Sequence, residues 1–519
     1  MILRDIKIID IIQDGRGVAK TLGKTAFVEN AVYGETLDAQ VIAEKRNFLE
    51  AKKIKTNIKS KFERKPPCPY FYECGGCSIM DINYDKQIEL KKNLIKNAIK
   101  KSTGIEIKDL EIVESPEFGY RNKIRLTVDK EGGLNYLKNY SNQKVKIDNC
   151  LIASDYICQN LSQIEEISKE INRKFDGVIR EISIRTNNKD ILLNLYGTYN
   201  KDCQNYIKKN WQNSKFHINL IDRRKTYAIN GDGKLDFKIK DKTFKISADD
   251  FYQVNQYQIE NLYDLARKFL GEKQKLLDLY CGSATSSMSI NDDHIVGVEI
   301  NKNAIKDAKE NATRNGLKDY KFIAKNAKFI DSNFIKENKI DAVTVDPPRA
   351  GLDKEVVKTI ANTEIEKIVY ISCNPQTLAR DIKRFMDRGY ELKKIRALDM
   401  FPQTMHVETV ALLSHQVIEK DIYVEYELKD DDIVPHKQAT YKEIKEWILN
   451  KYGFNVSDLY IGQAKEKFGL DKRKNYNISK KENQKVPKCP EEKMEAIKEA
   501  FIHFKMIDEW RKKEKEATE

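Results

Sequence analysis

The sequence predicts an α/β protein built around a doubly wound parallel sheet, with β-rich regions before it and a helical extension after it. From about residue 246 to about residue 415, short apolar strands alternate with helix-like segments, which is typical of such a sheet. Before this part the chain reads as short strands separated by turns. Beyond it, apolar residues recur at helical spacing. The order of these patterns indicates four consecutive regions.

The first region, residues 1–58, is expected to form a small β-barrel. Its short alternating strands are broken by turns at a spacing that suits a closed sheet. These turns are Asp14-Gly15, Gly17, Leu22-Gly23 and Tyr33-Gly34. Lysine and arginine recur beside them, which makes the region a candidate surface for a polyanion, although an ordinary solvated surface has a similar composition.

A group of cysteines opens the second region. Cys68, Cys74 and Cys77 form a C-x5-C-x2-C pattern around a Gly-Gly pair. Three thiolates this close together need one further ligand for a closed metal site. Cys150 is the nearest later candidate, and Cys158 is the alternative. The spacing alone leaves zinc and an iron–sulfur cluster equally open.

The rest of the second region, which spans residues 59–245, is expected to be mostly β, with many short strands from about residue 120. Arg121, Lys123 and Arg125 lie around one of these strands. They are candidates for phosphate contacts, and an ordinary charged strand face is the alternative.

Strand ends in the third region, residues 246–415, carry the residue types of a cofactor site. “DLYCGSAT” reads as a strand, a small-residue turn and a helix start, and such a turn lets the backbone approach a ligand closely. “GVEI” puts Glu299 at the end of the next strand, where a carboxylate can bind both hydroxyls of a ribose. The turn lacks the G-x-G-x-x-G spacing of a pyrophosphate-binding loop, which favours S-adenosylmethionine over NAD.

Two later strand ends indicate covalent chemistry. “VTVDPPRAGLD” places Asp346 before Pro347 and Pro348, which make a stiff lip with Arg349 beside it. An acidic residue followed by prolines is frequent here in enzymes that methylate a planar nitrogen. The next strand end, however, delivers Cys373, and a thiol there indicates attack on an electrophilic ring carbon.

Attack of this kind suits methylation of uracil. Uracil C5 is too weakly nucleophilic to accept a methyl group directly, but addition of a thiolate to C6 turns the ring into an enolate that can. The C5 proton must leave afterwards, so a base is required. Glu408, at the opening of the last apolar strand, is the candidate base, and His406 is the alternative.

The composition of the chain favours a polyanionic partner in a reducing compartment. The net charge is +13, from 93 lysines and arginines against 80 aspartates and glutamates. No apolar run approaches the roughly 18 residues that span a bilayer. “MILRDIKIID” has no apolar core, so we expect no signal peptide and a cytoplasmic protein. The nine cysteines are then expected to be thiols or metal ligands.

Together these motifs resemble the bacterial RNA uracil-5-methyltransferases, specifically the branch with an N-terminal TRAM domain and a four-iron, four-sulfur (4Fe-4S) cluster. The resemblance runs from residue 1 to about residue 415. It rests on “DGRGVAK”, “VYGE”, “CPYFYECGGC” with Cys150, “YRNK”, “FYQVN”, “DLYCG”, “GVE”, “DPPRAGLD”, “SCNPQTLARD” and “DMFPQTMHVETVALL”.

The resemblance implies a Rossmann-like class I methyltransferase domain at residues 246–415, a TRAM-like barrel at 1–58 and a cluster-bearing domain at 59–245. It implies that the cluster is held by Cys68, Cys74, Cys77 and Cys150. S-adenosylmethionine would be bound by Gln253, Tyr280, Thr285, Glu299, Asn326 and Asp346. Cys373 would be the nucleophile and Glu408 the base.

The partner implied by the resemblance is RNA, with neither DNA nor a membrane expected, and 23S ribosomal RNA is the target that the cluster-bearing branch indicates. A transfer RNA uracil-54 methyltransferase is the first alternative. The second is a catalytically weak RNA-binding or folding protein of the same fold. It rests on Ala284, which stands where the family usually has glycine, and on a slightly shortened stretch between Thr285 and Glu299. Alanine is disfavoured at positive φ.

The fourth region, residues 416–519, extends past the resemblance and is expected to be a small helical module. Apolar residues recur at helical spacing from Tyr441, and Gly453 closes that helix. Two more helices are expected, on either side of a lysine-rich connector at residues 472–488. RNA binding and a solvated appendage are equally open as the role of this module.

Overall fold

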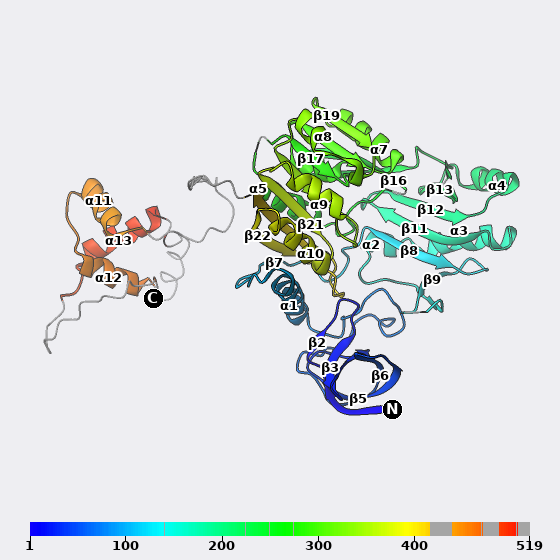
Figure 1. Ribbon diagram of the computed structural model, residues 1–519, viewed down its shortest axis with the longest axis horizontal. Helices are drawn as coiled ribbons and strands as arrows, with labels where there is room; N and C mark the ends of the chain where they lie inside the picture. Colours follow the sequence, from blue (N-terminus) through cyan, green and yellow to red (C-terminus); the bar gives the residue numbers. More distant parts are fainter. Residues whose placement is uncertain are drawn as a thin grey trace. The chain divides into compact units, whose positions relative to one another are not determined.

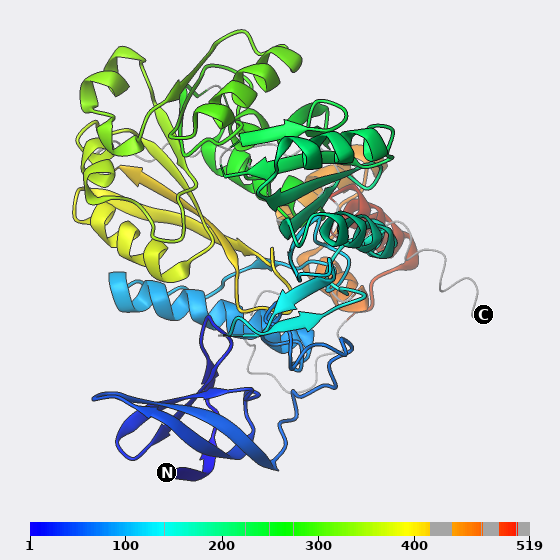
Figure 2. The same ribbon diagram turned by 90° about the vertical axis from the view of Figure 1, so that its right-hand side faces the viewer.

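The computed structural model describes residues 1–415, apart from 140, 224, 249 and 273, and residues 439–468, 470, 487–504 and 506. The chain forms two compact units, Met1–Glu419 and Lys420–Glu519 (Figures 1 and 2). No helix within the described ranges is both long and apolar enough to cross a bilayer.

The first unit begins with a curled six-stranded sheet, drawn in dark blue in Figure 2. Its strands are β1 (Ile2–Lys7), β2 (Asp10–Ile11), β3 (Gly17–Thr21), β4 (Lys24–Glu29), β5 (Thr36–Glu44) and β6 (Phe48–Ile58), in the order β1-β5-β6-β4-β3-β2. The buried apolar residues of these strands form a core that also takes in Ile79, Ile82, Leu90 and Met405 from later segments. The sheet is therefore packed onto the rest of the unit.

A second, seven-stranded sheet follows, in the order β10-β9-β8-β11-β12-β13-β14. Its strands are β8 (Lys123–Val128), β9 (Leu134–Leu137), β10 (Lys144–Lys146), β11 (Ile179–Thr186), β12 (Ile191–Gly197), β13 (His217–Asp222) and β14 (Lys225–Ala228). The sequence analysis expected mostly strands here, but three helices accompany the sheet: α2 (Asp155–Cys158), α3 (Leu161–Lys174) and α4 (Lys201–Trp211). Apolar residues of α3 and α4 pack in one core with the strands. The outer faces of both helices are charged, so their sequences carry few apolar residues and were not recognised as helices.

The third sheet has eight strands in the order β19-β18-β17-β20-β21-β23-β22-β7. The parallel strands are β17 (Leu276–Leu279), β18 (Ile295–Glu299), β19 (Tyr320–Ala324), β20 (Ala342–Val345) and β21 (Lys367–Ser372). β23 (Glu408–His415) runs antiparallel between β21 and β22 (Tyr390–Leu398), and β7 (Ile112–Val113) completes the edge. This is the doubly wound, Rossmann-like sheet that the strand–helix alternation predicted.

Helices cover both faces of this sheet. One apolar core joins it to α1 (Tyr84–Thr103), α9 (Lys354–Ala361) and α10 (Pro375–Met386). The other core joins it to α5 (Ile259–Leu270), α6 (Thr285–Ile290), α7 (Lys302–Arg314) and the hairpin of β15 (Lys234–Ile239) and β16 (Lys242–Ser247). The short helices η1 (Ala327–Phe329) and α8 (Ser332–Glu337) lie between β19 and β20 in the chain.

The domain boundaries expected from the sequence need one correction. Residues 59–245 were assigned to the central region, yet α1 and β7 belong to the eight-stranded sheet and its covering layer. The buried Lys91 Nζ donates to Asp399 Oδ1 at 2.6 Å, which ties α1 to the loop between β22 and β23. The hairpin β15–β16 likewise packs on α7, where Asn311 Oδ1 accepts from the backbone N–H of Lys245 at 2.7 Å. Local sequence pattern cannot reveal partners this remote.

The described part of the second unit contains three helices, α11 (Tyr441–Tyr452), α12 (Asp458–Lys467) and α13 (Glu491–His503). Thr440 and Glu443 form a capping box at the start of α11, and Gly453 ends it in the left-handed conformation with φ of 74°. The helices share a small apolar core. Residues 471–486 of the lysine-rich connector lie outside the described residues.

Candidate active site

The nucleophile and base predicted from the sequence meet at the end of two neighbouring strands. β21 ends at Ser372, and Ser372 is paired with Thr409 of the antiparallel strand β23. One step further, Cys373 and Glu408 therefore occupy opposite positions across the two strands. Asp346 follows β20, which is the other neighbour of β21. The sheet thus gathers a thiol and two carboxyl groups at one edge, where doubly wound proteins hold their ligands.

These three groups influence one another’s ionisation. Burial and then the nearby Glu408 and Asp346 together raise the pKa of the Cys373 thiol to about 11, against the opposing effect of Arg349. Burial and then Asp346 hold the pKa of Glu408 well above its usual range, again against Arg349. The pKa of Asp346 is raised to about 7 by burial and then by Asp278. Protons are therefore held tightly here, and Arg349 is the cation that favours their release.

The proline lip that carries Arg349 is fastened to α10. The carbonyl oxygen of Arg349 accepts from Asn374 Nδ2 at 3.1 Å and from Thr377 Oγ1 at 3.2 Å. Gly351 has a φ of 76°, and a Cβ there would lie 2.5 Å from Asp381 Oδ2, so only glycine fits. Buried Asp381 in turn accepts from the N–H of Leu352 at 2.7 Å.

His406, the alternative base, lies beside the same arginine. Its Nε2 is 3.4 Å from Nη2 of Arg349. Burial and then Arg349 lower the pKa of His406 to about 4, so its ring is neutral at physiological pH. Among the charged neighbours of the Cys373 thiol, Glu408 raises its pKa the most. Glu408 remains the better placed candidate.

The turn after β17 is conformationally unusual. Tyr280, Gly282 and Ala284 have φ values of 69°, 52° and 63°, so three of five consecutive residues are left-handed. A Cβ added to Gly282 would meet no atom within 4 Å, so the turn faces open space there. Ala284 adopts the positive φ that the sequence analysis regarded as disfavoured for alanine, and it is fully buried. The position is strained but packed.

Sequence reasoning missed Asp278, the residue under this turn. It lies within β17, is 1% exposed, and accepts hydrogen bonds from Ser286 Oγ at 3.1 Å, from Ser287 Oγ and from Thr344 Oγ1 at 2.9 Å. Burial raises its pKa to about 6. The available signal was a lone carboxylate inside the apolar run “LLDL”. Asp278 joins the turn to the strand that delivers Asp346.

The other predicted cofactor residues lie around the same sheet edge. Glu299 ends β18, and its Oε1 accepts from the N–H of Asn301 at 2.8 Å. Thr285 starts α6 and is hydrogen-bonded to Tyr263. Asn326 follows β19, where its Oδ1 caps η1 by accepting from the N–H of Lys328 at 3.0 Å.

Gln253 comes from the segment before α5. It is buried, and its carbonyl oxygen accepts from Asn122 Nδ2 at 3.0 Å. Five of the six predicted cofactor residues thus lie at or after strands of the eight-stranded sheet. The sixth, Gln253, comes from the segment before α5.

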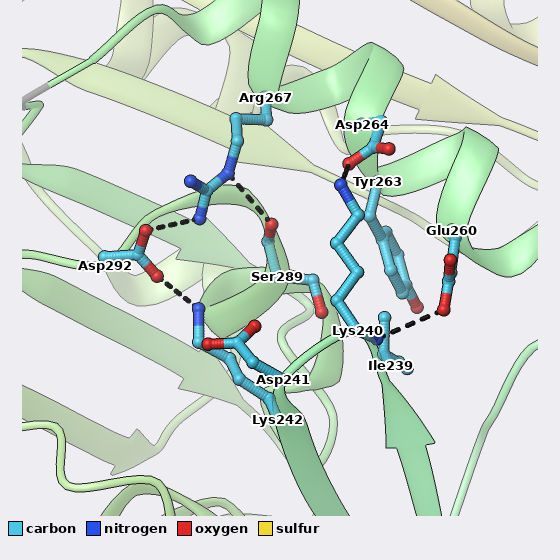
Figure 3. A pocket seen from close by; sticks show the side chains of 10 residues that line it. All are labelled: Ile239, Lys240, Asp241, Lys242, Glu260, Tyr263, Asp264, Arg267, Ser289 and Asp292. Atoms are coloured by element: carbon cyan, nitrogen blue, oxygen red, sulfur yellow. Dashed lines mark hydrogen bonds and ion pairs between the residues drawn. The ribbon is translucent and has the colours of Figure 1, made fainter.

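A hollow of about 200 Å³ lies elsewhere, between the β15–β16 hairpin and helices α5 and α6 (Figure 3). Three ion pairs join charged side chains that line it. Lys240 binds Asp264, Lys242 binds Asp292, and Arg267 Nη2 lies 2.6 Å from Asp292 Oδ2. None of the predicted catalytic or cofactor residues lines it. It is a surface network of ion pairs rather than the reaction site.

Four cysteines form a separate group beneath the first sheet. The pKa values of Cys68, Cys74 and Cys77 are raised by burial first, that of Cys74 to about 11, and Cys150 raises all three further. Across the described ranges, however, no three Cys, His, Asp or Glu side chains are arranged so that they could hold a single metal ion. Cys158 is turned away, since its Sγ donates to the carbonyl oxygen of Cys150 at 3.3 Å.

The surroundings of these cysteines suit a bound anionic group. The N–H of Gly76 points at Cys74 Sγ at 3.3 Å, and the hydroxyl of Tyr136 points at Cys150 Sγ at 3.6 Å. The guanidinium of Arg121 lowers the pKa values of Cys74 and Cys77, and its buried Nε has no hydrogen-bond partner among the described residues. The donor set and the buried cation fit thiolate ligands.

Comparison with known proteins assigns the chain to a family. The family model for tRNA (uracil-5-)-methyltransferases matches residues 83–416. An uncharacterised RNA methyltransferase of Caldanaerobacter subterraneus subsp. tengcongensis is 33% identical over 444 residues, 79% of this chain and 98% of that protein. One of Clostridium acetobutylicum is 33% identical over 443 residues, 79% of this chain and 96% of that protein.

A solved structure matches most of the chain. The tRNA (uracil-54, C5)-methyltransferase of Pyrococcus abyssi, in complex with S-adenosyl-L-homocysteine, is 27% identical with a TM-score of 0.63, and the match covers 78% of this chain and 99% of that one. The fold is thus the Rossmann-like fold of class I methyltransferases. The chain belongs to the tRNA (uracil-5-)-methyltransferase family, whose enzymes methylate uracil C5 in RNA with S-adenosylmethionine.

Proposed function

We propose that this enzyme methylates C5 of a uridine in 23S ribosomal RNA, with Cys373 as the nucleophile and Glu408 as the base. The observation that supports the proposal best is the pairing of β21 with β23, which puts these two side chains opposite each other beside Asp346. A nucleophile and a base that must act on adjacent ring atoms need this proximity.

The proposed reaction has three steps. Cys373 loses its proton to water, a step that Arg349 favours by lowering the pKa of the thiol, and the thiolate adds to uracil C6. C5 of the resulting enolate then attacks the electrophilic methyl group that bound S-adenosylmethionine would supply, and the methyl–sulfur bond breaks to leave S-adenosylhomocysteine. Glu408 then takes the C5 proton, and the electrons of that bond form the C5–C6 double bond as the Cys373 thiolate leaves. Uracil regains its ring with one methyl group added.

For S-adenosylmethionine we propose six binding residues: Gln253, Tyr280, Thr285, Glu299, Asn326 and Asp346. Glu299 stands at the end of the second strand of the sheet, where a carboxylate can accept from ribose hydroxyls. The left-handed turn at Tyr280 and Gly282 brings backbone close to the ligand.

We further propose a 4Fe-4S cluster on Cys68, Cys74, Cys77 and Cys150. A four-iron cluster is wider than one ion, so its thiolate ligands lie further apart than the ligands of a zinc ion. The described cysteines raise one another’s pKa values but are not arranged to hold a single ion, which is compatible with such a spacing. Anaerobically purified protein is expected to contain about four irons per chain. Cys150→Ala should lower the iron content, whereas Cys158→Ala should not; the reverse result would make Cys158 the fourth ligand.

The choice of ribosomal RNA rests on the resemblance of the barrel and cysteine motifs to the TRAM-containing, cluster-bearing branch. One observation favours transfer RNA uracil-54 instead: the Pyrococcus abyssi enzyme that matches this chain is named for that reaction. Both RNAs occur in the cytoplasm, where all nine cysteines would remain free thiols or ligands, as they are in the structure.

Mapping 5-methyluridine in ribosomal and transfer RNA from cells lacking this protein decides the target. A site missing only from 23S RNA supports the proposal, and loss at position 54 of transfer RNA replaces it. Binding of S-adenosylmethionine to the purified protein tests the remaining alternative, a catalytically weak RNA-binding protein, because the strained Ala284 lies in the cofactor turn. That alternative would be favoured if the protein did not bind S-adenosylmethionine and if cells lacking it kept every 5-methyluridine.

A further inference from the structure

Gln403 occupies a costly conformation close to the proposed base. It lies in the segment between β22 and β23, five residues before Glu408, and is fully buried. Its φ of 69° is left-handed, a conformation that residues other than glycine, asparagine and aspartate seldom adopt. Such strain persists only where the surroundings fix the residue firmly, and it clusters at functional sites.

The backbone of Gln403 is held from two directions. Its N–H donates to Oε1 of Gln87 in α1 at 3.1 Å. Its carbonyl oxygen accepts from the N–H groups of Ser78 at 2.9 Å and Ile79 at 3.1 Å. Ser78 directly follows Cys77, so the cysteine segment is one of the supports of the segment that leads to Glu408.

The side chain of Gln403 uses both ends of its carboxamide. Oε1 accepts from Arg64 Nη2 at 2.8 Å and from Gln87 Nε2 at 3.0 Å. Nε2 donates to Oε2 of Glu117 at 2.9 Å. Arg64 and Glu117 are themselves joined by an ion pair of 2.6 Å. An amide is required because neither a carboxylate nor an apolar group can accept and donate in these directions.

The segment beyond Gln403 is short and tightly packed. Met405 and Val407 are fully buried, and His406 is hydrogen-bonded to Thr404 through its backbone N–H at 3.2 Å. A change in the backbone at Gln403 is therefore transmitted to Glu408 rather than absorbed by a loose loop. At the other end of the segment between β22 and β23, Asp399 accepts a hydrogen bond from the buried Lys91 Nζ.

We propose that Gln403 is a positioning residue, which sets the place of Glu408 opposite Cys373 and links the cysteine segment to the proton-removal step. The inference rests on the proposed role of Glu408. Gln403 touches neither substrate nor cofactor in this assignment; it acts through the backbone of residues 404–407. Its loss should therefore slow the step that follows methyl transfer and leave the earlier steps intact.

The test separates these steps in the full-length enzyme. Gln403→Met keeps the side-chain length and removes its hydrogen bonds. With 5-fluorouridine RNA and S-adenosylmethionine, this variant should form the covalent adduct at a rate within about threefold of wild type. With ordinary uridine RNA, release of product should be roughly 10- to 100-fold slower, and a methylated protein–RNA adduct should accumulate on denaturing gels, as with Glu408→Gln.

A matched control measures the effect of losing a buried amide elsewhere. Asn172, 1% exposed in α3, also uses both ends of its amide, donating to the carbonyl oxygens of Asp129 and Ile179 and accepting from the N–H of Ile179. Asn172→Leu should lower the melting temperature without accumulating the adduct. If Gln403→Met behaves like Asn172→Leu, Gln403 is merely structural and the inference is wrong.

A swapped pair tests the inference even if Gln403→Met is too unstable to assay. Gln403→Glu alone sets two carboxylates side by side and should accumulate the adduct. Adding Glu117→Gln restores one carboxylate and one carboxamide beside Arg64, and should recover product release to within about threefold of wild type. Failure of this rescue would overturn the inference. A wild-type enzyme that forms no adduct with 5-fluorouridine RNA would instead overturn the proposed function itself.

Discussion

Ser372 and Thr409 face each other across the antiparallel strands β21 and β23, and this one register places Cys373 opposite Glu408. A shift of the register by one residue would turn each side chain to the other face of the sheet. The register is fixed by buried apolar residues on both strands, among them Ile371 and Val410. The active site is therefore specified by the same packing that stabilises the sheet.

The first prediction concerns the ionisation of the nucleophile. The pKa of Cys373 is about 11, and the thiolate is the reactive form, so the thiolate fraction rises about tenfold per pH unit below that value. The rate of adduct formation with 5-fluorouridine RNA should rise from pH 7 to pH 9 accordingly, as measured on quenched denaturing gels. Glu408→Gln removes a negative neighbour and should move the profile to lower pH. A flat wild-type profile would show that the thiol is already ionised at pH 7.

The second prediction tests Arg349. This guanidinium lowers the pKa values of both Cys373 and Glu408, so Arg349→Gln should raise them. Adduct formation at pH 7.5 should become slower by about tenfold for each unit of pKa, and the ratio to wild type should be the same at pH 9, because both pH values lie well below the pKa of about 11. Arg388→Gln, at an exposed arginine beyond α10, is the control for the loss of one positive charge. Equal profiles for the two variants would count against a catalytic role for Arg349.

The third prediction concerns stability. Burial raises the pKa of Asp278 from 3.8 to about 6, so the folded protein binds this proton more tightly than the unfolded chain. The stability from this group is present below about pH 4 and lost as pH rises through 6, a change of about 3 kcal/mol. Asp278→Asn cannot ionise. Relative to wild type, its unfolding free energy in urea should therefore increase by up to about 3 kcal/mol between pH 4 and pH 7.5. A difference that is independent of pH would contradict the raised pKa.

The fourth prediction concerns the first, six-stranded sheet as an RNA-binding surface. Lys55, Lys59 and Lys61 are exposed on or just after β6. Replacing all three with glutamine should weaken RNA binding and reduce the slope of log K against log salt by up to about 2, since each phosphate contact to a single strand contributes roughly 0.7. Binding of S-adenosylmethionine should not change.

The control for that experiment replaces Lys302, Lys306 and Lys309, exposed on α7, in the same way. Substitution is preferable to deletion of residues 1–58, because the six-stranded sheet packs against Met405 and Leu90, and its removal would expose them close to the proposed base Glu408. If both triple variants reduce the salt slope equally, this sheet has no special role in RNA binding, and only the total charge of the protein matters.

Much of the catalytic layer could be predicted from local sequence, because its parallel strands are continuous apolar runs whose ends carry polar residues. Cys373, Glu408 and Asp346 were predicted as site residues in this way, and the structure brings them to the same end of neighbouring strands. Asp278 was missed because its hydrogen-bond partners come from α6 and β20, and no local pattern reveals them. Gln403 lies within the motif “DMFPQTMHVETVALL”, but its role could not be predicted, because its hydrogen-bond partners come from four separate segments of the chain.

The domain boundaries predicted from the sequence also differ from those of the structure. The helix α1 itself was visible in the local sequence, which has a capping residue at Asn83 and a terminating glycine at Gly104. Its place in the protein was not, because α1 packs against α10 and contacts the segment after β22, both about 300 residues further along the chain. Pairing at that distance is decided by tertiary packing and not by local propensity.

The placement of α1 has a consequence for synthesis of the protein. Lys91 and Asp399 are 308 residues apart, so at about 5–20 residues per second a ribosome takes roughly 15–60 s to make the partner of this buried lysine. Throughout that interval the apolar face of α1, with Ile95 and Ile99, lacks its final cover. The helix made early in translation closes a layer made late. A chaperone that shields nascent apolar surfaces would therefore be needed most between the emergence of α1 and that of α10.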